Sequence, residues 1–136
     1  MSKYLSREWV ERGRVQVERD QRFRTLSAGI QASILCVVHE QPAHADEVFF
    51  IDFDDGHIRD IYSGPRSEFE ARGVQPTFEV HGDYDTFREI QEGHLTQATA
   101  LMRGRLRLKG SLLKALKYMK TLDAVTDVLR EVPTEF

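Results

Sequence analysis

The chain has 136 residues, of which 40% are hydrophobic and 30% are charged, and its formal net charge is −3. These values are typical of a soluble globular domain with a core of its own, and they disfavour nucleic acid as a partner. No apolar run is long enough to cross a bilayer, and the first residues lack the apolar core of a signal peptide. The single cysteine, Cys36, excludes an internal disulfide. We therefore expect a cytoplasmic protein with one domain over residues 1–136.

An N-terminal helical region is predicted over residues 1–28, with a helix over 6–27 that divides near Asp20. The region is rich in arginine, and a basic amphipathic helix can lie on an anionic membrane surface. Acidic residues are interspersed among the arginines, so a solvated helix face is the favoured interpretation. Transient contact with a membrane surface stays open as an alternative.

Residues 29–136 are expected to form the sheet and the C-terminal helices. β-branched and apolar residues predict five strands, over 30–39, 47–53, 57–63, 76–82 and 105–109. A loop is expected over 41–46, and Asp54-Asp55-Gly56 is typical of a hairpin turn. Helices are expected over 83–93, where Asp83 can form the N-cap, over 96–102, and after a second N-cap at Ser111. Strands and helices in separate runs indicate an α+β fold, with helices on one face of a largely antiparallel sheet.

The segment Ala100-Leu-Met-Arg-Gly-Arg-Leu-Arg-Leu-Lys-Gly110 alternates basic and apolar residues between two glycines. It resembles the signature of the sterol carrier protein type-2 family, the non-specific lipid-transfer proteins. Residues 85–93 resemble the helix that precedes this signature, and a looser likeness runs from Ala28 to the end of the chain. Both ends of the chain resemble small stand-alone bacterial members.

The resemblance implies a non-catalytic carrier that needs no cofactor and holds an apolar ligand in a cavity between the sheet and the C-terminal helices. The ligand classes implied are fatty acids, fatty acyl-CoA, phospholipids and sterol-like molecules. An alternative is an accessory subunit that delivers a hydrophobic substrate to a separate catabolic enzyme. The periodicity alone leaves open whether the inward-facing residues fill a core or line a cavity. The residues expected to contact the lipid are Phe49, Ile51, Phe53, Phe78, Phe87, Leu101, Met102, Leu106, Leu108, Leu113, Leu116, Met119, Leu122, Val125 and Leu129.

Motifs for catalysis or metal binding are weaker than the resemblance to the sterol carrier signature. His39, His44 and Asp46 match no standard zinc spacing, and residues 52–56 lack the ligand pattern of a calcium loop. No nucleophile elbow and no glycine-rich phosphate loop occur. A small enzyme acting through aspartate or histidine is a further alternative, but the sequence favours neither a catalytic site nor a metal site.

Overall fold

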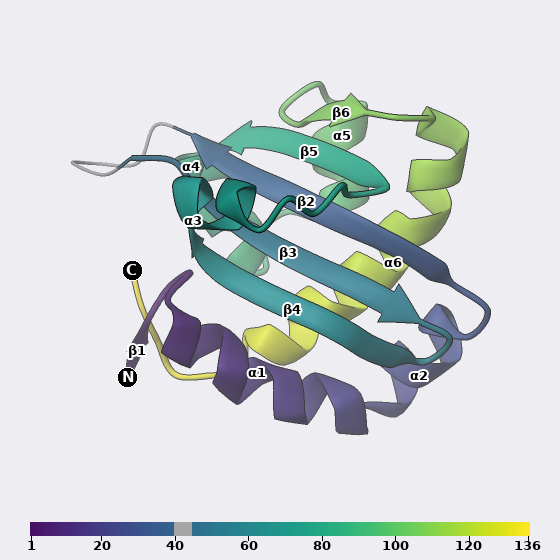
Figure 1. Cartoon of the computed structure of the whole chain (residues 1–136), viewed down its shortest axis with the longest axis horizontal. Helices are drawn as coiled ribbons and strands as arrows, with labels where there is room; N and C mark the ends of the chain where they lie inside the picture. The colour runs from purple at the N-terminus through teal and green to yellow at the C-terminus, as the bar shows by residue number, and fades with distance from the viewer. Residues whose placement is uncertain (40–44) are drawn as a thin grey trace.

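The computed structural model describes residues 1–39 and 45–136 and has two main layers, a five-stranded sheet and a set of helices packed on it (Figure 1). The predicted loop over 41–46 lies mostly outside the described residues. The order of elements is β1 (Ser2–Lys3), α1 (Arg7–Arg19), α2 (Gln21–Ser27), β2 (Gln31–His39), β3 (Glu47–Asp54), β4 (His57–Pro65), α3 (Arg66–Ala71), β5 (Phe78–Asp83), α4 (Tyr84–Gln91), α5 (Gln97–Met102), β6 (Arg107–Lys109), α6 (Leu112–Leu129) and β7 (Thr134–Glu135).

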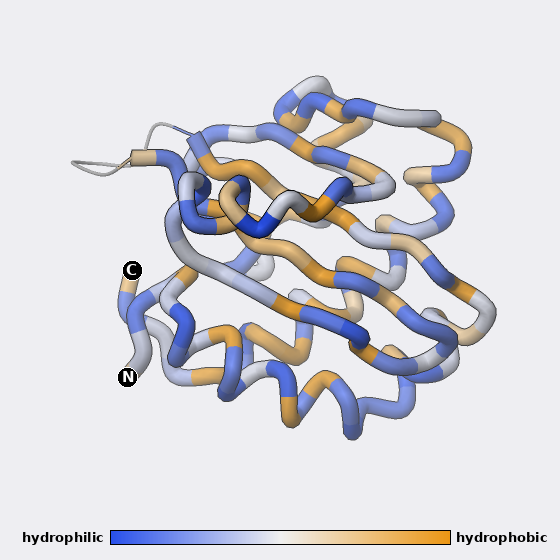
Figure 2. The backbone as a smooth tube through the Cα atoms, viewed as in Figure 1, coloured by the Kyte–Doolittle hydropathy of each residue, from blue (hydrophilic) through white to orange (hydrophobic). Residues whose placement is uncertain are grey.

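The sheet has the strand order β4-β3-β2-β5-β6 and confirms the α+β prediction. Three of its four strand pairs are antiparallel, and only β2 and β5 run parallel. The hairpin between β3 and β4 turns at Asp55 and Gly56, whose φ angles of 47° and 84° are the left-handed pair that a type I′ turn requires. Strand β2 is central and apolar along most of its length (Figure 2).

Helix boundaries follow local capping. Ser6, Asp20, Asp83 and Thr96 each accept a hydrogen bond from a backbone N–H in the first turn of the following helix. Asp20 also ends α1, so the predicted division of the N-terminal helix at this residue is confirmed. Ser111 occupies the N-cap of α6, but its side chain makes no capping hydrogen bond.

The two faces of the sheet carry separate apolar clusters. The larger cluster joins alternate residues of β2, β3 and β5 to helices α1, α2, α4 and α6. The smaller cluster lies on the opposite face, which we call the outer face, and contains Leu35, Val37, Val48, Phe50, Tyr62 and Phe69. Phe69 comes from the short helix α3, which lies on the near side of the sheet in Figure 1. The main helical layer therefore covers one face, as predicted, and α3 covers part of the other.

Strand β6 is shorter than predicted. The backbone N–H groups of Arg105 and Leu106 both donate to the carbonyl of Ala100, at 2.9 and 3.3 Å, so these two residues close a turn after α5. Only Arg107 to Lys109 pair with β5. The basic and apolar alternation that predicted a longer strand thus spans both a turn and a strand.

The two ends of the chain lie side by side. Strands β1 and β7 pair in parallel, with Ser2 opposite Thr134 (Figure 1). Trp9 reinforces the contact, because its Nε1 donates a hydrogen bond of 3.0 Å to Thr134 Oγ1. This pairing holds Tyr4 and Leu5 over the helical face of the sheet.

Candidate functional site

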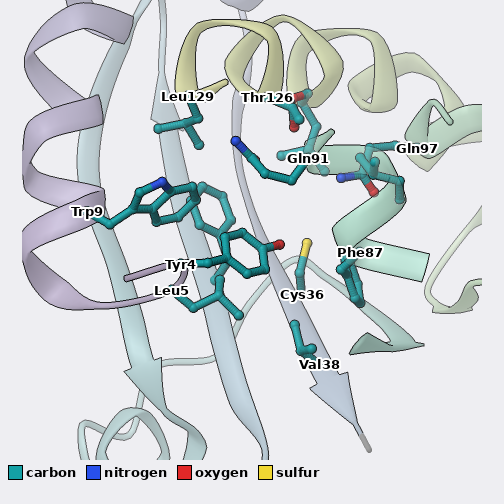
Figure 3. A pocket seen from close by; sticks show the side chains of 13 residues that line it. Tyr4, Leu5, Trp9, Cys36, Val38, Phe87, Gln91, Gln97, Thr126 and Leu129 are labelled. Carbon is teal, nitrogen blue, oxygen red and sulfur yellow. Dashed lines mark hydrogen bonds between the residues drawn. The ribbon is translucent and has the colours of Figure 1, made fainter. Parts of the chain in front are cut away.

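A small cavity lies between the sheet and the helical layer. Its volume is about 30 Å³, enough for one or two water molecules and far below the roughly 300–1,000 Å³ of a pocket that encloses a small ligand. Strands β2 and β3 form its floor and helices α1, α4, α5 and α6 form its walls (Figure 3). The residues that line it are Tyr4, Leu5, Trp9, Cys36, Val38, Phe49, Phe87, Ile90, Gln91, Gln97, Leu122, Thr126 and Leu129.

Aromatic side chains enclose one side of the cavity. The rings of Tyr4 and Trp9 meet edge to face with centroids 5.1 Å apart, and Trp9 meets Phe49 in the same way at 6.3 Å. Leu5, which is 1% exposed, fills the space beneath them despite a φ angle of 65°. That backbone conformation is strained for a leucine, by roughly 1–3 kcal/mol, so the burial of its side chain must outweigh the strain. Tyr4 and Leu5 together act as a plug, and we use that name for the pair.

The lining is uncharged but not wholly apolar. Among the described residues, no aspartate, glutamate, lysine, arginine or histidine borders the cavity. The side-chain amide oxygen of Gln97 is buried and has no hydrogen-bond partner. The Gln97 backbone is held by Asp123, whose carboxylate accepts the Gln97 N–H at 2.8 Å. Figure 3 shows the Gln91, Gln97 and Thr126 side chains together at one end of the cavity, whereas the Tyr4 hydroxyl points toward the Cys36 sulfur. This end can therefore accept or donate hydrogen bonds to a neutral polar group.

The ionisable groups in the lining stay protonated near neutral pH. Burial raises the pKa of the Cys36 thiol to about 12, and it raises the pKa of the Tyr4 phenol well above its ordinary value. Neither group supplies an anionic nucleophile, because the thiolate and the phenolate are both disfavoured in this environment. The arrangement suits binding more than covalent chemistry.

The structure distributes the fifteen predicted lipid-contacting residues over four environments. Four of them border the cavity, namely Phe49, Phe87, Leu122 and Leu129. Six are buried in the surrounding core, namely Ile51, Phe53, Phe78, Leu106, Met119 and Val125. Leu101, Leu108 and Leu116 are partly buried. Met102 and Leu113 are 70% and 85% exposed, because the end of α5 and the first turn of α6 extend beyond the face that the sheet covers.

The prediction missed the N-terminal contribution to the site. Tyr4, Leu5 and Trp9 come from the first ten residues, yet they lie over β2 and β3. The only sequence signal for them is a cluster of large apolar residues around the capping Ser6, which predicts a buried helix start without saying what it covers.

One group of histidines and acids lies on the outer face, away from the cavity, and includes His39 and Asp46. His39 Nδ1 is 2.9 Å from Asp46, His39 Nε2 is 2.8 Å from His81 Nδ1, and His81 Nε2 is 2.7 Å from Glu79. His44 lies outside the described residues. Within the described part of the chain, no group of three His, Cys, Asp or Glu side chains is placed to hold a metal ion.

Comparison with known proteins agrees with this architecture. The model of the SCP-2 sterol transfer family matches residues 15–123. The chain belongs to this family. The predicted resemblance to the sterol carrier protein type-2 family is thereby confirmed. A search of curated proteins gives no match.

Solved sterol carrier structures share the fold. A crystal structure of sterol carrier protein 2 has a TM-score of 0.80 at 22% identity and covers 96% of this chain and 100% of its own. The solution structure of a conserved hypothetical protein from Thermus thermophilus, possibly a sterol carrier protein, also has a TM-score of 0.80 at 22% identity, with 99% and 93% covered. Palmitated SCP2L2 from Aedes aegypti has a TM-score of 0.56 at 19% identity, with 90% and 95% covered. Among the described residues of this family member, no helix is both long and apolar enough to cross a bilayer.

Proposed function

We propose that residues 1–136 act as one non-catalytic carrier that binds the apolar chain of a lipid-like ligand between β2, β3 and the helices α4 and α6. The observation that carries the proposal is the uncharged cavity at this position, with a buried and unpartnered amide oxygen at one end. Membership of the SCP-2 family supports lipid transfer as the activity. One relative of this fold is described as palmitated, and a fatty acyl chain is the ligand that we favour.

The cavity must expand before an acyl chain can enter, because 30 Å³ is the space of one or two water molecules. The plug is the part that we expect to move. The backbone hydrogen bonds that hold it are few: the short β1–β7 pairing and one bond of 2.8 Å from the Tyr4 N–H to the Glu135 carbonyl. Leu5 also releases its backbone strain when it leaves the left-handed conformation. A long acyl chain transferred from water gains on the order of 10 kcal/mol, at about 0.8 kcal/mol for each CH₂. That gain can offset the loss of the contacts made by the plug.

The chemistry of the lining also limits the head group. An ionised carboxylate inside the cavity would have no cation to pair with, and an unpaired buried charge is strongly unfavourable. The head group inside is therefore neutral: a hydroxyl, a protonated acid or an ester, with a hydroxyl donating to Gln97 Oε1. A charged or bulky head group would have to remain at the mouth of the cavity.

Trp9 provides a direct test, because it is the only tryptophan in the chain and it borders the cavity. Titration with a saturated fatty alcohol should change its fluorescence saturably, with one ligand per chain. An alkane of the same length should bind more weakly, and Gln97→Leu should remove that difference by removing the acceptor. Native mass spectrometry of freshly purified protein provides a second readout, a co-purified lipid. No saturable change in fluorescence together with no bound lipid would refute the proposal.

A further inference from the structure

One edge of the molecule concentrates positive charge and exposed apolar side chains. It runs from the end of α5 through the edge strand β6 to the first turns of α6, residues 101–120, at the upper right of Figure 1. We call it the basic edge. These twenty residues contain seven of the 19 lysines and arginines and none of the 22 aspartates and glutamates. The rest of the chain therefore has twelve cationic residues against 22 anionic ones.

The cations of the basic edge are largely free of acidic partners. Arg105 forms an ion pair with Glu89. Across the described residues, no carboxylate forms a salt bridge with the other six, which are Arg103, Arg107, Lys109, Lys114, Lys117 and Lys120. These six side chains are exposed. The positive field of this edge is therefore available to a ligand or a surface.

Large apolar side chains protrude among these cations. Met102, Leu112 and Leu113 are 70%, 50% and 85% exposed. They account for three of the seven large hydrophobic side chains that are exposed in the described structure. The start of α6 is correspondingly orange in Figure 2, beside hydrophilic segments. These exposed apolar side chains and the six cations lie on one edge, so the edge presents hydrocarbon and positive charge together.

From this arrangement we infer that the basic edge docks on anionic lipid bilayers. Single protruding apolar side chains surrounded by cations fit a plane of anionic headgroups with hydrocarbon beneath it. A stable protein partner would instead require a contiguous and well-packed patch. The bilayer would be the surface with which the carrier exchanges lipid, and this role of docking rests on the proposed function. Docking itself requires no bound ligand.

Helix α1 is the competing surface, since its arginines also suggested membrane contact. It carries four arginines but also three glutamates, which leaves it one positive charge. Arg12 is paired with Glu8 at 2.8 Å, and Val15 is its one exposed large apolar side chain. The basic edge has more cations, fewer ion pairs and more exposed apolar surface than α1, so it should dominate docking.

The test compares matched charge reversals in vesicle co-sedimentation with no lipid ligand added. Lys114→Glu/Lys117→Glu alters the basic edge, and Arg12→Glu/Arg19→Glu makes the same change on α1. Each lysine near an anionic surface strengthens partitioning about fivefold. The first variant should therefore bind phosphatidylcholine vesicles containing phosphatidylserine at least about 25-fold more weakly than the wild type. The second variant should bind nearly as well as the wild type. High salt should weaken wild-type binding.

Insertion of the apolar side chains can be measured separately. Leu113→Cys and Val15→Cys can each be labelled with an environment-sensitive dye, because the one native thiol, Cys36, is buried and has its pKa raised to about 12. A blue shift on addition of anionic vesicles is expected at position 113 and not at position 15. The reverse pattern, or equal binding to vesicles of phosphatidylcholine alone, would overturn the inference.

The result of the vesicle-binding tests does not depend on the proposed function. Fatty alcohol titration in solution, followed through Trp9, should be unchanged in Lys114→Glu/Lys117→Glu, so a failure of docking and a failure of ligand binding appear in different assays. Absence of binding to either kind of vesicle would overturn the inference and would leave an acidic protein as the partner that this edge fits.

Discussion

The size and place of the cavity can be tested by adding a single methylene group. Val38 lies on β2, is 1% exposed and borders the cavity. Its neighbour Val37 is fully buried in the outer-face cluster with Phe50 and Phe69. Val38→Ile and Val37→Ile therefore make the same chemical change on adjacent residues of one strand, with the side chains on opposite faces of the sheet.

Opposite effects on stability are expected. Cavity volume destabilises a core by about 24 cal/mol for each Å³, so filling the 30 Å³ next to Val38 should stabilise the protein by about 0.7 kcal/mol. The gain is close to the value of about 0.8 kcal/mol for burying one CH₂. Val37→Ile adds the same group to a packed cluster and should destabilise the protein by about 1–3 kcal/mol.

Urea unfolding and thermal melting measure both changes. The melting temperature of Val38→Ile should rise by about 2 °C, and that of Val37→Ile should fall by several degrees. Val38→Ile should also bind a fluorescent fatty acid about fourfold more weakly, because the added methylene occupies the space of one methylene of the ligand. If Val38→Ile destabilises the protein as much as Val37→Ile and leaves ligand affinity unchanged, the cavity does not extend to β2 and the proposed binding site is wrong.

Three further predictions concern stability. Gly13→Ala would place a Cβ atom 2.0 Å from Leu129 Cδ2 in the contact between α1 and α6. Overpacking should destabilise the protein by about 2 kcal/mol, and the better helix propensity of alanine should offset about 1 kcal/mol of this. Urea unfolding should therefore show a free energy of unfolding lower by about 1 kcal/mol. Asp83→Ala should lower the free energy of unfolding by about 1 kcal/mol at neutral pH, because it removes a capping hydrogen bond. Ser111→Ala breaks no capping bond and should leave the free energy of unfolding almost unchanged. Hydrogen bonds from Thr86 lower the pKa of Asp83, so the contribution of the carboxylate is complete above its unfolded pKa and should fade as the pH falls through the lowered value. Burial lowers the pKa of His81 below its ordinary value of 6.5, so the folded state binds that proton less tightly and stability should fall as the pH drops below 6.5. His81→Gln should make stability depend less on pH in this range, and an unchanged pH dependence would show that His81 is not its cause.

Local chemistry explains why the elements could be predicted. The β-branched and apolar residues of β3 and β4, the Asp55-Gly56 turn and the caps at Asp20 and Asp83 each depend on residues close together in sequence. Ser111 shows the limit of this reasoning, because a residue type that favours an N-cap still needs a side-chain rotamer that reaches the N–H groups. The sequence places Ser111 correctly and cannot supply that rotamer.

Contacts between distant residues could not be predicted in the same way. The parallel pairing of β2 with β5, the cover that α3 gives to the outer face and the contact between the two chain ends depend on the folded arrangement. The same reason explains why Met102 and Leu113 were assigned to the lipid site. Their apolar character and helical spacing are those of a buried face, but the sheet ends before it reaches them, so they remain exposed.

The proposed activity has two parts, ligand binding and membrane docking, and both depend on where the apolar side chains lie. A carrier must keep its ligand site closed in water, since an open apolar cavity would be unfavourable, and the plug achieves this at the cost of strain at Leu5. It must also recognise the place where opening is useful, and a bilayer surface differs from bulk water in negative charge and accessible hydrocarbon. The basic edge responds to both of these properties. Apolar side chains at two separate places, one set buried beneath the plug and one set exposed among cations, are what a carrier of this kind requires if docking and ligand binding are distinct steps.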